Sequence, residues 1–335
     1  MIHAPKKILI IRLSSIGDIV LTTPVLRCLK KKWPEVEIQC IVKGRYVDLL
    51  RHNPRISKVH ILKNSLSESI QELRKEQFDV VIDLHRNFRS RWICFRLQKP
   101  VLSIKKSNWK KWLMVRAKLP LTVTHVVDRY LATLKKWNIQ SDEKGLELFI
   151  PTEVEQQARR DLDAYFSKRS ISFPPIAIAL GATHGTKKWL PEYFLELIHQ
   201  VGRPVIMLGG VSEVSEAKYI ESSIQVPCFN AVGKYDLLTS AALMKEASLL
   251  ITHDTGMMHI ASAFQMKIIS LWGSTVPQFG MAPYKTSFDA LEVNNLNCRP
   301  CSRIGYEKCP QGHFRCMRDL LPATVASIVR RNLSS

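Results

Sequence analysis

The sequence contains no apolar run long enough to cross a bilayer as a helix, which takes about 20 residues. Residues 1–13 form a strand pattern rather than a signal peptide. These absences argue against a helical membrane protein and predict that the chain stays in the cytoplasm. At 335 residues, the chain is long enough for two domains with sizeable cores.

Acidic residues are scarce in the first half of the chain. Residues 1–170 hold 34 Lys and Arg against 17 Asp and Glu, whereas residues 171–335 hold 15 against 12. No Asp or Glu lies between Asp83 and Asp128, where basic residues are interspersed with aromatic ones, including Trp92, Trp109 and Trp112. Such a field attracts nucleic acid, an anionic membrane surface, or an acidic substrate embedded in one. Basic residues with tryptophan suit the headgroup region of a bilayer, so we favour the membrane.

Several signatures are also missing. No G-x-G-x-x-G follows the first apolar run, which argues against a nucleotide-linked oxidoreductase. No RNP, KH, zinc-finger or helix-turn-helix pattern accompanies the positive charge, although a basic nucleic-acid-binding protein stays an alternative and predicts salt-sensitive oligonucleotide binding. The Asp161-Leu162-Asp163 triplet lies in a helical, charge-rich pattern, where its side chains diverge, and we interpret it as a solvated face rather than a metal motif.

Short apolar runs alternate with helical patterns along the chain, which predicts parallel sheets with covering helices. The expected strands are 8–13, 36–42, 59–62, 78–84, 176–180, 205–208, 249–252 and 268–272. The expected helices are 24–33, 46–50, 66–75, 125–138, 153–168, 237–245 and one after residue 256. A domain boundary is expected near Ser170–Pro175, where two prolines precede a new strand.

The stretch from Leu249 to Ser274 predicts strand, turn, helix and strand. In a parallel sheet, its first turn, His253 to Gly256, lies at the carboxyl edge, where the N–H groups of a starting helix suit a phosphate. Gly256 allows close approach of a ligand, and Asp254 can accept hydrogen bonds. His259 lies one helical turn further on. A plain helix N-cap with a surface histidine explains the same residues.

Two distant motifs resemble glycosyltransferase family 9, the ADP-heptose:lipopolysaccharide heptosyltransferases. One is Asp254-Thr255-Gly256-Met257-Met258-His259 with Leu271-Trp272-Gly273, and the other is the opening KILIIRLSSIGD of Lys7–Asp18. Lys187-Lys188-Trp189-Leu190-Pro191 lies between them, so the similarity covers nearly the whole chain. It implies a GT-B fold, an α/β arrangement of two Rossmann-like doubly wound parallel-sheet domains facing a cleft.

The resemblance also implies roles for residues of the second half. The residues that it implies bind the donor are Thr183, Lys187, Glu213, Asp254, Thr255, Gly256, Met257 and His259. Lys187 would also offset charge on the departing diphosphate, with Lys188 as the competitor if the motif is shifted by one residue. Glu213 is nearly as well explained as an acidic residue at a helix start.

In the first half, the resemblance makes Asp18 the general base, on the loop after the first strand. Without the resemblance, a turn residue bonding its own backbone is the better interpretation. Ser15, Gly17, Arg86 and Arg89 are the acceptor-binding candidates. The two arginines would meet phosphates or carboxylates of a lipid acceptor, although neighbouring arginines can substitute.

Cysteines gather near the carboxyl end as C-x2-C-x7-C-x6-C, formed by Cys298, Cys301, Cys309 and Cys316. Clustered cysteines in a cytosolic chain suggest a structural zinc, and a rigid loop with buried thiols is the alternative. No catalytic cofactor is expected.

The sequence thus predicts an inverting, metal-independent transferase with an acceptor domain at 1–170 and a nucleotide-sugar domain at 171–335. The resemblance implies ADP-L-glycero-D-manno-heptose as donor and the lipopolysaccharide inner core as acceptor, at the cytoplasmic face of the inner membrane, with no nucleic acid partner. A family 9 transferase with another nucleotide sugar or acceptor is the nearest alternative.

Overall fold

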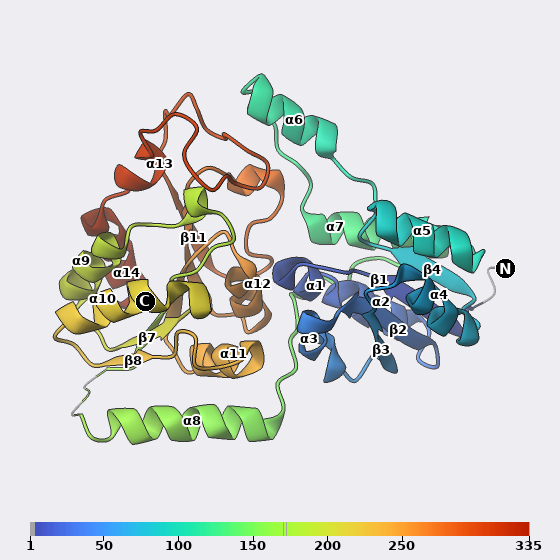
Figure 1. The fold of residues 1–335 in the computed structure, drawn as a ribbon, viewed down its shortest axis with the longest axis horizontal. Coiled ribbons are helices and arrows are strands. Elements are labelled where there is room, and N and C mark those ends of the chain that lie inside the picture. The colour runs from blue at the N-terminus through green and yellow to red at the C-terminus, as the bar shows by residue number, and fades with distance from the viewer. Residues whose placement is uncertain (1–3, 170, 172, 335) are drawn as a thin grey trace. The chain divides into compact units, whose positions relative to one another are not determined.

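The computed structural model describes residues 4–169, 171 and 173–334, and the chain divides into two compact units (Figure 1). Unit 1 comprises residues 1–106 and 124–149, and unit 2 comprises residues 107–123 and 150–335. This division differs from the boundary expected at Ser170–Pro175, of which Ser170 and Ser172 lie outside the described residues.

Unit 1 contains a five-stranded parallel sheet in the order β3-β2-β1-β4-β5. Its strands are β1 (Lys7–Ile11), β2 (Glu37–Lys43), β3 (Lys58–Leu62), β4 (Val80–Asp83) and β5 (Val101–Ser103). Its helices are α1 (Ile16–Val20), α2 (Thr23–Lys32), η1 (Gly44–Tyr46), α3 (Asp48–Arg51), α4 (Leu66–Lys75), α5 (Phe88–Leu97), α7 (Val126–Leu131) and η2 (Ala132–Trp137). The central strand β1 is an almost continuous buried apolar run, as expected for a strand covered on both faces.

Unit 2 contains a six-stranded parallel sheet in the order β11-β10-β9-β6-β7-β8. Its strands are β6 (Ile176–Ala179), β7 (Val205–Leu208), β8 (Cys228–Asn230), β9 (Leu249–His253), β10 (Lys267–Trp272) and β11 (Phe288–Glu292). Its helices are α6 (Asn108–Arg116), α8 (Thr152–Phe166), η3 (Gly185–Lys187), α9 (Pro191–Val201), η4 (Val211–Glu213), α10 (Val214–Ser223), α11 (Leu237–Lys245), α12 (Gly256–Ala263), η5 (Pro277–Phe279), α13 (Arg315–Arg318) and α14 (Pro322–Ser334).

Two segments that precede the expected boundary pack with unit 2. Helix α8 lies against α11. Ion pairs join Glu155 to Lys245, the last residue of α11, and Arg159 to Glu246, which follows it. Met114 of α6 is buried in a cluster with Val276 and Phe279. Apolar contact and paired charge therefore attach both helices to the second sheet.

Each sheet has one point at which the strand order reverses. In unit 1 this point lies between β1 and β4, and in unit 2 it lies between β9 and β6. Loops leaving two such neighbouring strands pass to opposite faces, so a crevice opens at their carboxyl ends, where doubly wound proteins bind ligands. The topology therefore directs attention to residues 12–18 and 84–90, and to residues 181–188 and 254–256.

None of the helices in the described part of the chain is long and apolar enough to span a membrane.

Candidate active site

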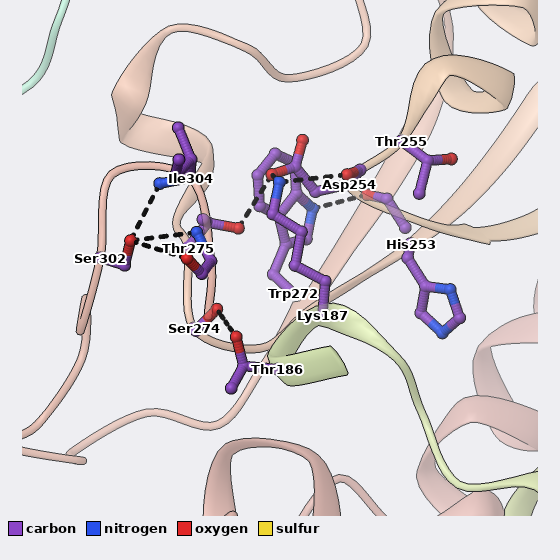
Figure 2. A network of polar contacts seen from close by, with 12 residues as sticks. Thr186, Lys187, His253, Asp254, Thr255, Trp272, Ser274, Thr275, Ser302 and Ile304 are labelled. Atoms are coloured by element: carbon purple, nitrogen blue, oxygen red, sulfur yellow. Dashed lines mark hydrogen bonds and ion pairs between the residues drawn. The ribbon is translucent and has the colours of Figure 1, made fainter. Parts of the chain in front are cut away.

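The reversal point of unit 2 holds a carboxylate paired with an amine (Figure 2). Asp254 follows β9, and its Oδ2 accepts hydrogen bonds from Lys187 Nζ at 2.6 Å and Thr275 Oγ1 at 2.9 Å. Both charged side chains are 13% exposed, so the pair is mostly shielded but open to a ligand. The β6, β9 and β10 turns thus converge on one charged group.

Helix α12 begins immediately after this carboxylate. Thr255 is its N-cap residue in an extended conformation, and Gly256 is the first helical residue. The N–H groups of a first helical turn lack partners inside the helix and carry partial positive charge, which suits a phosphate. Met257 is half-buried on this turn, whereas His259 is only 2% exposed and packs within the unit.

The position of Lys187 is fixed by its neighbour Thr186, which the sequence did not single out. Thr186 is buried, and its hydroxyl lies 2.9 Å from Ser274 Oγ and 2.8 Å from the donating N–H of Tyr306. Its backbone N–H donates to the Tyr306 carbonyl at 3.0 Å. Gly185 passes so close to this segment that an added Cβ would lie 2.3 Å from the Glu307 carbonyl oxygen. The Cys-rich segment therefore supports the turn that carries Lys187.

Lys188, the alternative to Lys187 as the diphosphate-binding lysine, has a different partner. Its amine donates to Glu213 Oε1 at 2.8 Å, and the other Glu213 oxygen accepts from the Gly210 N–H at 2.9 Å. Burial alone would raise the pKa of Glu213, but Lys188, Ser212 and this N–H together hold that pKa below its ordinary value. Glu213 is 4% exposed and ties the β6 turn to the β7 turn, while Thr183 is exposed to solvent.

His253, at the end of β9, is completely buried. Its Nε2 accepts a hydrogen bond from the Trp189 N–H at 2.8 Å, which requires that nitrogen to be unprotonated. Burial lowers the pKa of His253 to about 4. A neutral histidine thus joins the β9 strand to the β6 turn.

The reversal point of unit 1 also holds a carboxylate paired with a cation. Asp18 Oδ1 accepts from Arg12 Nη2 at 2.6 Å, and its Oδ2 accepts from the Ser15 hydroxyl at 2.8 Å. Asp18 was expected on a loop but lies in the short helix α1, where it reaches back to the Ser15 N–H at 3.3 Å. Gly17, in the same helix, is buried. One oxygen of the partly exposed Asp18 carboxylate therefore bonds its own turn, while the other faces Arg12.

Arg12 is held rigidly, although sequence reasoning did not identify it. Its Nε donates to the Ser14 carbonyl at 2.9 Å and its Nη1 to the Leu84 carbonyl at 2.7 Å. Burial opposes its charge, but Asp18 raises the pKa of Arg12 above its ordinary value. No local pattern reveals this arrangement, because Leu84 lies 72 residues away.

Four further groups surround the Arg12–Asp18 pair: His85, Lys106, Arg129 and Tyr130. Burial, with the charge of Arg12 nearby, lowers the pKa of His85 to about 4. Burial also lowers the pKa of Lys106 and of Arg129. The Tyr130 hydroxyl is fully buried and has no hydrogen-bond partner in the described structure. Cationic side chains thus outnumber the carboxylate at this point.

The predicted acceptor arginines follow β4. Arg86 has φ of 50°, and its Nη1 donates to the Ile104 carbonyl at 3.1 Å, while its N–H donates to Asp83. Arg89 is exposed on the first turn of α5. Both lie on the loop side of β4, but Arg86 is partly committed to the backbone.

The four clustered cysteines are free thiols, with Cys316 buried and the others half-buried. Burial raises the pKa of Cys316 to about 12 and that of Cys301 to about 11. Across residues 4–169, 171 and 173–334, no three His, Cys, Asp or Glu side chains form a group suited to a metal ion. The structural zinc expected at Cys298, Cys301, Cys309 and Cys316 is therefore not supported, and the alternative of a rigid loop fits the contacts better.

Two doubly wound parallel-sheet domains are the architecture of the GT-B class, and solved structures of heptosyltransferase type share this fold. Residues 67–309 match the family model described as glycosyltransferase family 9 (heptosyltransferase). The chain therefore belongs to glycosyltransferase family 9 and is a glycosyltransferase, which confirms the resemblance seen in the sequence.

Known relatives agree with this placement. The lipopolysaccharide core heptosyltransferase OpsX of Haemophilus influenzae is 25% identical over 312 residues, which cover 89% of this chain and 87% of that protein. A family 9 glycosyl transferase structure from Veillonella parvula matches with a TM-score of 0.80 at 23% identity, over 98% of this chain and 97% of that one. Heptosyltransferase II of E. coli matches with a TM-score of 0.76 at 18% identity, over 98% of both chains.

Proposed function

We propose that this chain transfers a heptose from ADP-L-glycero-D-manno-heptose to the inner core of lipopolysaccharide with inversion and without a metal ion. The single observation that carries the proposal is the Lys187–Asp254 pair at the start of α12. The Lys187 amine on the β6 turn and the helix N-terminus on the β9 turn together offer a diphosphate both a charge and directed N–H donors. The relatives are described as heptosyltransferases of the lipopolysaccharide core, which supports this choice of sugar and acceptor.

In the proposed reaction, an acceptor hydroxyl oxygen attacks the anomeric carbon from the face opposite the nucleotide. Asp18 takes the proton of that hydroxyl as the new C–O bond forms. The bond from the anomeric carbon to the diphosphate oxygen breaks, and ADP departs with the electron pair. Lys187 stabilises the negative charge that develops on the leaving diphosphate, a task that divalent metals perform in other transferases.

Several features of unit 1 support an anionic, lipid-linked acceptor. Lys106, Arg129 and Arg12 concentrate positive charge around Asp18, so an acceptor bearing phosphate or carboxylate would be attracted there. Arg12 and Ser15 hold the carboxylate in one orientation, which general-base catalysis requires. Because the acceptor is lipid-linked, we further propose peripheral attachment at the cytoplasmic face of the inner membrane.

The test is to incubate the protein with ADP-heptose and deacylated core acceptor and to measure ADP release by chromatography, with and without EDTA. We expect Asp18→Asn to lower kcat by about 10²–10⁴, the usual worth of general-base help. Asp48→Asn, an exposed carboxylate of α3, is the matched control. Undiminished transfer by Asp18→Asn would remove Asp18 from the mechanism, and transfer only from another nucleotide sugar would refute the donor.

A further inference from the structure

Helix α5 presents large aromatic side chains to solvent. Phe88 is 81% exposed, Phe95 is 68% exposed and Trp92 is 40% exposed. Most large aromatic side chains are buried to a greater degree, because exposure leaves their apolar surface in water. Trp92 and Phe95 already contact each other, with ring centroids 5.6 Å apart. The three rings therefore form one patch, which we call the α5 aromatic face.

The spacing of these residues places them on one side of the helix. Successive residues of an α-helix turn by about 100°, so positions 88, 92 and 95 fall within an arc of about 60°. The opposite side of α5 packs into the core through Ile93, which is fully buried, and Leu97. The helix is therefore apolar on two faces, and only one of them is covered within unit 1.

Arginines border the α5 aromatic face on both sides. By the same geometry, Arg89 and Arg96 lie along one edge of the stripe and Arg91 lies along the other. The Arg96 guanidinium lies 5.7 Å from the centre of the Trp92 ring. Residues 84–127 contain no Asp or Glu that would neutralise this border. An apolar stripe with arginines on both edges is complementary to a surface whose apolar interior lies beneath a layer of negative charge.

We infer that the α5 aromatic face docks this protein on an anionic phospholipid bilayer, with its aromatic rings between the lipid headgroups and its arginines on the lipid phosphates. Charge complementarity decides the occupant, since an uncharged protein surface would leave three arginines without partners. This inference rests on the proposed function, because a lipid-linked acceptor requires the enzyme to work at such a surface. To that proposal, the inference adds that helix α5 and its aromatic and arginine side chains make the contact with the membrane.

Helix α6 of unit 2 shows the same design independently. Trp109 is 62% exposed and Trp112 is 55% exposed, whereas Met114 on the other side is buried against Phe279. Lys110 lies in the same acid-free segment, with its amine 5.8 Å from the centre of the Trp109 ring. Tryptophan and basic residues without acidic ones are typical of helices that lie in a bilayer interface.

The first test is sedimentation with vesicles of phosphatidylglycerol and phosphatidylcholine, and with vesicles of phosphatidylcholine alone. We expect the wild type to bind the anionic vesicles and to be released by high salt. The double variant Trp92→Ser/Phe95→Ser should lose at least about tenfold in partitioning, because two apolar side chains no longer leave water. Tyr219→Ser, an exposed aromatic on α10, is the matched control and should bind as the wild type does.

A second readout separates docking from catalysis. Trp92→Ser/Phe95→Ser should transfer sugar to the soluble deacylated acceptor at the wild-type rate, but should slow at least about tenfold on acceptor embedded in anionic vesicles. Arg91→Gln/Arg96→Gln should lose anionic binding while retaining soluble transfer. Vesicle binding needs no donor sugar, so the docking result stands or falls separately from the proposed reaction.

Three outcomes would overturn the inference. Equal binding of wild type and Trp92→Ser/Phe95→Ser to anionic vesicles would place the contact elsewhere. Self-association in light scattering that Trp92→Ser/Phe95→Ser abolishes would make a second copy of the chain the occupant. Tighter binding to a single-stranded oligonucleotide than to vesicles, lost in the same variant, would assign the face to nucleic acid.

Discussion

Replacing Lys187 with methionine tests the centre of the proposed donor site, because the change nearly keeps the length of the side chain and removes its charge. Lys187 Nζ lies 2.6 Å from Asp254 Oδ2. If a diphosphate binds at the start of α12, this amine lies between two negative groups. The variant therefore loses one contact with the ligand and leaves the Asp254 carboxylate facing the diphosphate without compensation.

Both losses have an estimable size. A hydrogen bond to a charged group contributes about 1.5–3 kcal/mol. At an effective dielectric constant of about 20, two unit charges about 6 Å apart repel by about 3 kcal/mol. Since both side chains are 13% exposed, water screens this repulsion only in part. We expect Lys187→Met to weaken ADP binding by roughly 10²–10³-fold, and the added change Asp254→Asn to restore roughly tenfold of it.

Isothermal titration calorimetry measures the ADP affinity of each of these variants directly. Lys218→Met on α10 is the control for loss of a positive charge. The single variant Asp254→Asn completes a double-mutant cycle, which gives the coupling free energy between Lys187 and Asp254 in ADP binding. If ADP affinity falls less than about threefold in Lys187→Met, Lys187 does not contact the diphosphate. If Asp254→Asn weakens the Lys187→Met protein further, the carboxylate faces away from the ligand.

Three further predictions concern the supports of this site. Gly185→Ala should cost about 1–3 kcal/mol in urea unfolding and weaken ADP binding, because its Cβ would overlap the Glu307 carbonyl. Thr186→Val should cost about 1–3 kcal/mol, because the Tyr306 N–H loses a buried acceptor. His253 has a pKa of about 4 when folded and about 6.5 when unfolded, so the unfolded state binds its proton first as pH falls. His253 alone should therefore lower stability by about 3 kcal/mol between pH 7 and pH 4, and His253→Gln should remove that share of the dependence.

Controls for these variants lie in the same chain. Gly44→Ala meets only an ordinary contact at 3.5 Å, so it should unfold nearly as the wild type does. His199→Gln, exposed on α9, should keep the full pH dependence. A Gly185→Ala protein as stable as Gly44→Ala would show that the Cys-rich segment moves aside freely. An unchanged pH profile in His253→Gln would assign the acid sensitivity to other groups.

Several elements could be predicted from the sequence, because their patterns are local, although the long helices α9 and α14 were not expected. The strand expected at 205–208 and the helices expected at 66–75 and 237–245 have the bounds found for β7, α4 and α11. The strands β5, β8 and β11 were missed, since three to five residues with partial burial carry no period. Helix α5 was also missed, because exposed aromatic residues on its outer face obscure the amphipathic pattern.

The site was predictable only where its residues form contiguous motifs. Asp254 and Lys187 stand in such motifs, and the structure brings them together. Arg12 stands in the opening motif with Asp18 but was missed, because its bond to the Leu84 carbonyl depends on strand order, which no single segment encodes. Thr275 was missed for the same reason, because its bond to Asp254 joins turns 21 residues apart.

The contacts of Arg299 explain why a cysteine-rich loop follows the last strand of the sheet. This side chain is nearly buried and donates to the carbonyls of Trp272, Gly273, Thr275 and Val293 and to the Glu292 carboxylate. It therefore fixes the turn that presents the Thr275 hydroxyl to Asp254. The Cys301 N–H donates to the Ser274 carbonyl at 3.0 Å in the same turn. Backbone and guanidinium bonds thus hold this loop in place and link it to the Asp254 carboxylate.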